Sequence, residues 1–285
     1  MDFLHHPYTQ KIIDFAFEED LSTRGDVTTL ATLPDNCTAQ AKLIFKEEGI
    51  AAGIALAEYI FKQLETSARV DIRVHDGQRV DKGEIGFYVT ASYHTLLKAE
   101  RVVLNFMQRM SGIATLTNTV VQTLKGLPTR VLDTRKTTPG LRILEKWAVQ
   151  IGGGVNYRFG LYDWVMIKDN HIDHAGGIEK AITRVQEYLR KHNLNLKITV
   201  ETRNLQEVEQ VLKIGGIDQI MFDNMDEDTM RKAVELVNKQ YLTEASGNIT
   251  LENARRKAET GVDFISMGML THSVKSLDIS LKAML

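Results

Sequence analysis

Six short apolar runs in the last two thirds of the sequence each end in a polar or charged residue. These terminal residues are Asp133, Lys168, Glu201, Asp223, Glu244 and Ser266. In a barrel of alternating strands and helices, the residues that follow the strands gather at one mouth, where active sites are built from several strand ends. A single polar residue at the end of a strand is ordinary. Six in succession favour a functional site.

Basic residues lie among these positions, in predicted loops or strand ends rather than on helix faces. They are Arg135, Lys136, Arg158 and Lys168. The planar guanidinium of arginine suits a carboxylate, and the compact ammonium of lysine suits a phosphate. A solvated basic surface would explain the same charges. The glycine run at residues 152–154, which lets backbone approach a ligand closely, favours an anion pocket.

Two later loops place serine and glycine between a predicted strand and a predicted helix start, in EASGNIT (244–250) and SMGMLTHS (266–273). Backbone N–H groups at a helix N-terminus bind phosphate, and in α/β barrels such loops follow the last strands. Ser246, Gly247 and Gly268 are therefore candidate phosphate ligands. Helix capping by Ser246 or Asn248 would explain the first loop alone.

Glu201 and Asp223 lie on the same predicted rim. Carboxylates near a phosphate usually hold Mg²⁺ or sugar hydroxyls, because direct contact would be repulsive. A pairing of each acid with a neighbouring lysine or arginine is the alternative. His171 and His272 lack the spacing of zinc ligands, and the sequence shows no serine-hydrolase motif. Together these residues indicate a phosphorylated sugar that reacts with a carboxylic acid.

The spacing of the apolar runs predicts the elements that hold these residues. The runs begin at residues 129, 164, 197, 219, 241 and 263, with helical stretches between them. Such regular steps are typical of successive strand and helix units in a parallel sheet that closes into a barrel. Residues before 129 lack this rhythm and predict a small α+β domain. Its expected helices are 7–17, 51–64, 95–110 and 113–124, with a break at Gly112, and its expected strands are 39–45, 70–74 and 85–91.

Composition excludes several classes of partner. The 285 residues have a net charge of −2, so no global positive field attracts nucleic acid or anionic lipid. Positive charge is instead concentrated in residues 130–171, which hold seven Lys or Arg against four acids. A single cysteine, Cys37, the absence of a targeting pattern and a longest apolar stretch of only residues 49–57 predict a cytoplasmic protein without a membrane span.

The chain resembles the quinolinate phosphoribosyltransferase family along nearly its whole length. The matching segments are EDLSTRGDVTT, AERVVLNFMQRMSGIAT, DTRKTTPGLR, GGGVNYRFGLYDWVMIKDNH, VETRNLQE, IMFDNM, EASGNI and DFISMGMLTHS. The resemblance implies an α/β protein with an N-terminal α+β domain (1–112) and an open, incomplete barrel of about six strands (113–270). We expect residues 271–285 to form a C-terminal helix that packs back on the first domain. The family also implies a homodimer with sites between subunits, and leaves a higher oligomer open.

The resemblance assigns a role to each matching residue. Arg135 and Arg158 would bind the carboxylates of quinolinate, and Arg101 would reach across from the other subunit. Lys136 and Lys168 would meet the charges of phosphoribosyl pyrophosphate. Glu201 and Asp223 would hold ribose hydroxyls and the Mg²⁺ cofactor. Ser246, Gly247 and Gly268 would bind the 5′-phosphate, and His272 is a candidate for the pyrophosphate.

One residue departs from the family pattern. Tyr157 stands where the family usually has histidine, in the segment GGGVNYR. Tyrosine donates one hydrogen bond but carries no positive charge near neutral pH, so carboxylate recognition would rest more heavily on the arginines. The reaction that the family implies joins the phosphoribosyl group to quinolinate, releases pyrophosphate and CO₂, and gives nicotinate mononucleotide, a step toward NAD.

Three other functions fit parts of the sequence. A phosphoribosyltransferase for nicotinate or another small acid, without decarboxylation, would need the same phosphate ligands. A Schiff-base aldolase could use Lys168, a strand-end lysine in a barrel. A carrier module could use the turn-rich segment HDGQRVDKGE (75–84), although that segment lacks a lysine between small apolar flanks.

Overall fold

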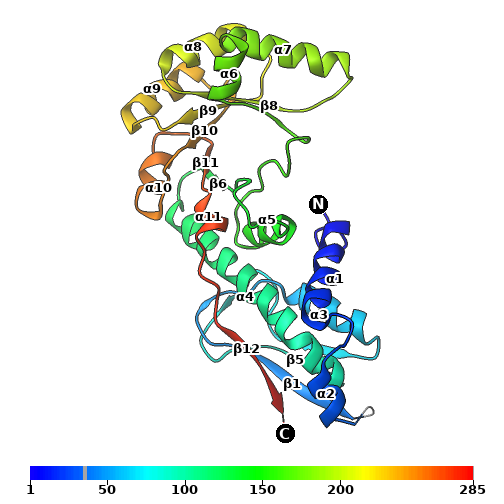
Figure 1. The fold of residues 1–285 in the computed structure, drawn as a ribbon. Helices are drawn as coiled ribbons and strands as arrows, with labels where there is room; N and C mark the ends of the chain where they lie inside the picture. The colour runs from blue at the N-terminus through cyan, green and yellow to red at the C-terminus, as the bar shows by residue number, and fades with distance from the viewer. Residues whose placement is uncertain (35–36, 285) are drawn as a thin grey trace. The chain divides into compact units, whose positions relative to one another are not determined.

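The computed structural model describes residues 1–34 and 37–284, and Figure 1 shows its elements. The chain forms two compact units, each assembled from separate stretches of sequence. The first contains residues 1–119, 137–153 and 270–285, and the second contains 120–136 and 154–269. This division differs from the expected boundaries after 112 and 270, because 137–153 belongs to the first unit, where the Trp147 ring stacks on Phe3 at 6.0 Å.

The first unit is built on a four-stranded antiparallel sheet in the order β12-β1-β5-β3. Its strands are β1 (Thr38–Phe45), β3 (Arg69–Ile72), β5 (Ile85–Ser92) and β12 (Ile279–Met284), and β2 (Gly49–Ile50) pairs separately with β4 (Arg79–Val80). The period of two along β1 buries Leu43 and Phe45 on one face. The unit's helices are α1 (Pro7–Leu21), α2 (Val27–Thr32), α3 (Ile54–Leu64), α4 (Tyr93–Thr123), α5 (Arg142–Ile151) and α11 (Met269–His272).

The end of the chain is a strand, so the expected C-terminal helix over 271–285 is wrong. β12 pairs with β1 from Phe45 opposite Ile279 to Gln40 opposite Met284. Ile279 and Leu281 are both buried and lie two residues apart, which is the periodicity of a strand. The pairing also covers an edge of β1 that would otherwise present unpaired backbone groups.

The long helix α4 replaces the two helices expected on either side of Gly112, so that expectation is also wrong. A Cβ atom at Gly112 would lie 2.2 Å from the carbonyl oxygen of Lys275. The glycine is therefore there because the backbone at residues 275–276 passes against the helix, and not because the helix ends. Glycine within a helix costs only about 1 kcal/mol relative to alanine, which a 31-residue helix tolerates.

The second unit is a six-stranded parallel sheet in the order β6-β11-β10-β9-β8-β7. Its strands are β6 (Arg130–Leu132), β7 (Val165–Ile167), β8 (Ile198–Thr202), β9 (Gln219–Asp223), β10 (Leu242–Ser246) and β11 (Phe264–Ser266). Its helices are α6 (Asp169–Ala175), α7 (Ile178–Lys191), α8 (Leu205–Ile214), α9 (Glu227–Val237) and α10 (Leu251–Ala258). β6 and β7 lie at the two ends of this order, so the barrel is open, and the predicted fold class is confirmed.

One face of this sheet forms an apolar interior. Leu132, Tyr157 and Met221 are buried there, with Val155, Trp164, Met166 and Phe264 packed against them. Side chains two residues further along a strand point to the same face, so Asp223 follows Met221 and Ser266 follows Phe264 on the interior side. Asp223 and Ser266 thus end their strands on the interior side, whereas Glu244, expected at the end of its strand, lies two residues before the end of β10.

Candidate active site

A lysine and two carboxylates occupy the ends of three neighbouring strands. Lys168 follows β7, Glu201 lies near the end of β8, and Asp223 ends β9. The Lys168 Nζ lies 3.5 Å from Glu201 Oε2. Burial raises the pKa of Glu201, the Lys168 charge lowers it, and the charge of Asp223 raises it further. The predicted grouping of these three residues is therefore present, and the alternative pairing of Glu201 with a lysine is part of it.

The donor set at Glu201 and Asp223 fits a divalent cation. The two carboxylates project from adjacent strands, and their mutual repulsion contributes to the raised pKa of Glu201. Within residues 1–34 and 37–284, no three His, Cys, Asp or Glu side chains gather as a metal site. Mg²⁺ usually takes one or two protein carboxylates and completes its shell with water and substrate phosphate, so two are sufficient.

The loop after β10 is shaped by a close approach to the loop after β9. Gly247 has a φ of 92°, and a Cβ atom there would lie 2.2 Å from Asn224 Oδ1. The Asn224 N–H donates to the Ser246 carbonyl at 2.9 Å, and Asn248 Nδ2 donates to Asn224 Oδ1 at 3.0 Å. Thr250 caps α10, so the alternative in which Ser246 or Asn248 is the cap is wrong. Gly268, the other candidate phosphate ligand, lies between β11 and α11.

Two arginines of the second unit lie close enough to repel each other. Arg158 is half-buried, and its pKa is lowered by burial first and by the charge of Arg135 second. Arg158 Nη1 donates to the Trp164 carbonyl at 3.3 Å. Like charges held together in this way favour an anion that accepts from both. Lys136, the next residue after Arg135, is exposed.

Tyr157 points its hydroxyl into the barrel interior. The side chain is 8% exposed, and its hydroxyl lies 2.9 Å from Thr199 Oγ1 and accepts from Gln219 Nε2 at 3.1 Å. Its ring lies edge-on to Trp164, with centroids 5.2 Å apart. Burial and the charge of Glu244 raise the pKa of the hydroxyl. Tyr157 is thus a neutral residue tied to the strands, and its predicted contact with a substrate stays a prediction.

Two polar residues beneath the strand ends were not assigned a role from the sequence. Gln219, at the start of β9, donates from Nε2 to Glu244 Oε2 as well as to Tyr157. Glu244 is fully buried within β10, and burial raises its pKa to about 7. The signal in the sequence was a polar side chain inside an apolar strand, which is uncommon unless the group is hydrogen-bonded.

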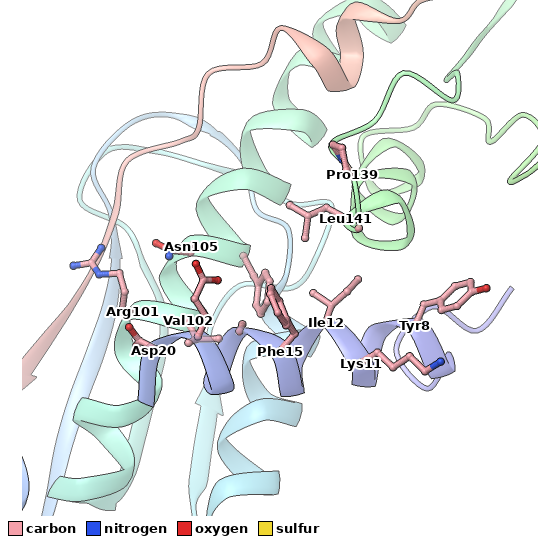
Figure 2. A pocket seen from close by; sticks show the side chains of 14 residues that line it. Tyr8, Lys11, Ile12, Phe15, Asp20, Arg101, Val102, Asn105, Pro139 and Leu141 are labelled. Atoms are coloured by element: carbon pink, nitrogen blue, oxygen red, sulfur yellow. The ribbon is translucent and has the colours of Figure 1, made fainter. Parts of the chain in front are cut away.

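The first unit holds the remaining two predicted residues. Arg101 is exposed on α4 and lines a cavity of about 600 Å³ beside α1, shown in Figure 2. The same lining contains Phe15, whose side chain is 65% exposed. His272 is exposed at the end of α11, and its Nδ1 lies 2.6 Å from Ser273 Oγ.

An ion pair between the half-buried Arg109 and the buried Glu145 holds the segments next to His272 and residue 138. Arg109 on α4 donates to Glu145 Oε1 from Nε at 3.1 Å and from Nη2 at 2.8 Å. It also donates to the carbonyl oxygens of Thr271 and Val274. Glu145 Oε2 accepts from the Thr138 N–H at 3.0 Å. Neither partner stands out in the sequence, because both lie on amphipathic helices where charge is expected.

An open parallel α/β barrel with cationic and acidic side chains at its strand ends defines a class of enzymes that act on small anionic substrates. The model of the quinolinate phosphoribosyl transferase C-terminal domain matches residues 113–282, and that of the N-terminal domain matches residues 26–111. The chain belongs to the quinolinate phosphoribosyltransferase family, as its resemblance predicted.

Similar proteins span the same length. The chain is 48% identical to the chloroplastic nicotinate-nucleotide pyrophosphorylase [carboxylating] of Arabidopsis thaliana, over 98% of this chain and 84% of that protein. It is 42% identical to the probable nicotinate-nucleotide pyrophosphorylase [carboxylating] of Bacillus subtilis (strain 168), over 98% and 94%. The crystal structure of NadC from Streptococcus pyogenes superposes with a TM-score of 0.90 and 36% identity, covering 97% of each chain. In the described parts of the chain, every helix is too short or too polar to cross a bilayer.

Proposed function

We propose that the chain transfers the phosphoribosyl group of phosphoribosyl pyrophosphate to quinolinate with decarboxylation, giving nicotinate mononucleotide, CO₂ and pyrophosphate. The observation that carries this is the pairing of two chemistries at the strand ends of one barrel. The charges of Arg135 and Arg158 act on each other, which suits the carboxylates of one acid, and Lys168, Glu201 and Asp223 are grouped, which suits a phosphorylated, hydroxyl-bearing substrate. Relatives over the whole chain carry the name of this enzyme.

The phosphate side of the site would work by charge and position. Lys136 and Lys168 neutralise the pyrophosphate as it leaves. Ser246, Gly247 and Gly268 hold the 5′-phosphate, and the positive φ of Gly247 gives the loop a turn that residues with a side chain rarely adopt. Mg²⁺, held by Glu201 and Asp223, would supply further positive charge to the leaving group.

The acid side of the site would orient the pyridine ring. Arg135 and Arg158 bind its carboxylates, which places the ring nitrogen against the anomeric carbon. The nitrogen lone pair forms the new bond to that carbon as the bond to pyrophosphate breaks. The resulting ring cation accepts the electron pair of the breaking bond to the 2-carboxylate, so CO₂ leaves and the ring carbon takes up a proton. Positioning and electrostatics supply most of the rate, so no strong general base is needed.

We also propose a homodimer in which Arg101 contacts quinolinate in the partner's site. Support comes from the exposed position of Arg101 beside an apolar cavity that includes the exposed ring of Phe15, since exposed apolar patches mark interaction surfaces. A mixture of an Arg101→Ala chain and an Arg135→Ala chain should recover activity, because hybrid dimers would contain one intact site. A mixture as inactive as its components would contradict the crossing. We propose a cytoplasmic location from the single cysteine, which is exposed.

The direct test is a reaction of purified protein with Mg²⁺, phosphoribosyl pyrophosphate and either quinolinate or nicotinate. Release of both CO₂ and pyrophosphate with quinolinate supports the proposal. Pyrophosphate release with nicotinate and none with quinolinate would replace it with the transferase that does not decarboxylate. Borohydride trapping of Lys168 with a carbonyl substrate would support an aldolase, and its absence would leave Lys168 as a charge that binds phosphate.

A further inference from the structure

A chain of side-chain hydrogen bonds crosses the interior of the barrel below the proposed site. Gln219 Nε2 donates both to Glu244 Oε2 and to the Tyr157 hydroxyl, at 3.1 Å for the latter. The hydroxyl lies 2.9 Å from Thr199 Oγ1, which also accepts from Trp164 Nε1 at 2.9 Å. Thr199 and Glu244 are fully buried, and Gln219 is 1% exposed.

The sheet register places this chain directly beneath the rim. Thr199 lies beside Gln219, and Asp223 lies beside Ser246 at the carboxyl ends of their strands. Thr199 precedes Glu201 by two residues, so both side chains point to the interior face. Thr199 and Gln219 therefore lie one layer below Glu201, and Glu244 lies in the layer of Glu201 itself.

Thr199 ties together the two ends of the loop that carries Arg158. The loop begins at Tyr157 and ends at Trp164, and both side chains reach the same Thr199 hydroxyl. Within the loop, Asp163 accepts the N–H groups of Phe159 and Gly160 at 2.7 and 2.9 Å. Arg158 itself donates to the carbonyl of Trp164. The direction of its guanidinium thus depends on where Thr199 holds the base of the loop.

A second tie fixes the backbone at the start of the loop. Asp133 accepts the Tyr157 N–H at 2.8 Å and Asn156 Nδ2 at 2.7 Å. Asp133 directly precedes the segment of Arg135, so the two arginine-bearing segments are joined. An apolar interior could fill the same volume, but polar groups joined in a chain specify one orientation of the side chains that they hold.

We propose that Thr199, with Gln219 and Glu244 behind it, is a positioning residue for acid recognition, acting through Tyr157 and Trp164 on the direction of Arg158. This inference rests on the proposed function, because it concerns the site for quinolinate. It also gives Tyr157 a role that its hydroxyl can perform from inside the barrel. The arginine pair receives the acid, and the buried chain below sets the spacing of that pair.

The experiment compares two threonine substitutions in the same sheet. Thr199→Val removes the hydroxyl that joins Tyr157 to Trp164 and keeps the β-branched shape. Thr243→Val is the matched control, because Thr243 is also buried in a strand and its hydroxyl donates at 2.8 Å to Asp263, outside the chain. Steady-state kinetics with both substrates, thermal unfolding and the indole N–H signals of the two tryptophans in NMR spectra are measured for each.

We expect Thr199→Val to raise the KM for quinolinate about tenfold, which corresponds to the loss of about one hydrogen bond. The KM for phosphoribosyl pyrophosphate and kcat should stay within about twofold of the wild-type values. Tyr157→Phe should act in the same direction, and Thr199→Ser should restore the wild-type KM. The Trp164 indole signal should move in Thr199→Val while that of Trp147 stays in place. Thr243→Val should change neither KM and leave both signals unchanged.

Two results would overturn the inference. If Thr199→Val weakens both substrates equally, or only as much as Thr243→Val at matched loss of stability, the hydroxyl serves the fold alone. If Thr199→Val keeps the wild-type KM for quinolinate, Arg158 does not depend on it. If the wild-type protein neither binds nor turns over quinolinate, the proposed function fails, and this inference fails with it. The wild-type measurement therefore distinguishes the two failures.

Discussion

The buried carboxyl of Glu244 should hold its proton far above the usual range for a glutamate. Burial raises its pKa from 4.5 to about 7, and its Oε1 has no hydrogen-bond partner among the described residues. A neutral carboxylic acid leaves no uncompensated charge in the interior, whereas an ionised one would need to be paired. The substitution that tests this is Glu244→Gln, which keeps the size and an oxygen that can accept from Gln219.

The free energy of unfolding should depend on pH through this group in one direction. The unfolded chain loses the proton near pH 4.5, while the folded chain keeps it until about pH 7. Between these values the unfolded state binds fewer protons than the folded state, so stability falls as pH rises and then levels off. With about 1.4 kcal/mol for each pKa unit, the total fall assigned to Glu244 is about 3 kcal/mol. The stability of wild type relative to Glu244→Gln should fall by that amount from pH 4 to pH 8.

The assay must report on the unit that contains Glu244, because two units need not unfold in a single step. A Trp147→Phe background leaves Trp164, in the second unit, as the one tryptophan, so its fluorescence follows the barrel during urea unfolding. Other carboxyls with raised pKa values, such as Asp76 in the first unit, are present in both proteins and cancel in the difference. A difference that stays flat from pH 4 to pH 8 would refute the reasoning, as would a ¹³C carboxyl signal, absent from Glu244→Gln, that titrates near the ordinary value.

Three further substitutions have expected outcomes. Arg135→Ala should raise the KM for quinolinate about 10- to 100-fold, as expected for the loss of a charge-assisted hydrogen bond, and should change the KM for phosphoribosyl pyrophosphate far less. Equal increases in the two KM values would contradict the assignment of Arg135 to the acid. Gly247→Ala should raise the KM for phosphoribosyl pyrophosphate, because the new methyl group would meet Asn224. The control Gly261→Ala has the same φ of 92° and no contact under 3.6 Å, so it should lower stability without changing the kinetics. Equal kinetic effects of the two substitutions would count against a phosphate-binding loop at Gly247. Glu145→Gln should lower the free energy of unfolding by about 3 kcal/mol, because it leaves the Arg109 charge without its buried partner. The control Glu259→Gln, in the exposed pair with Arg255, should lower it by less than about 1 kcal/mol. Similar shifts in melting temperature would show that the Arg109 pair is not the stronger one.

The barrel was predictable from sequence because its signals are local. Each strand is an apolar run bounded by polar residues, and the observed bounds of β9, Gln219–Asp223, are those of the run itself. The failures came from contacts between distant segments. Gly112 suggests a helix break in the sequence, but the structure shows that it makes room for the backbone near Lys275. The last residues were expected to form a helix, but they form the strand that pairs with the free edge of β1.

The candidate site shows the same limit. Lys168, Glu201 and Asp223 were grouped from sequence because parallel strands bring their carboxyl ends to one edge. The direction of Tyr157 was not predictable, since the residue lies outside the strands and its hydroxyl finds partners on β8 and β9. Gln219 was missed for a related reason. It begins β9, at the end of the strand opposite to Asp223, and only the register with Thr199 places it under the site.

The protonation of Glu244 connects the interior of the barrel to the chemistry at its rim. Glu244 and Glu201 occupy the same layer, since each lies beside Met221, and the charge of Glu201 is among the causes that raise the pKa of Glu244. If Glu244 were ionised, its charge would compete with Glu201 and Asp223 for the positive groups that the substrates need. When Glu244 is neutral, Lys168 pairs with Glu201 without competition, and the arginines stay available for the carboxylates of the substrate. Below about pH 7, the buried hydrogen-bonded chain can therefore orient the site without adding charge to it.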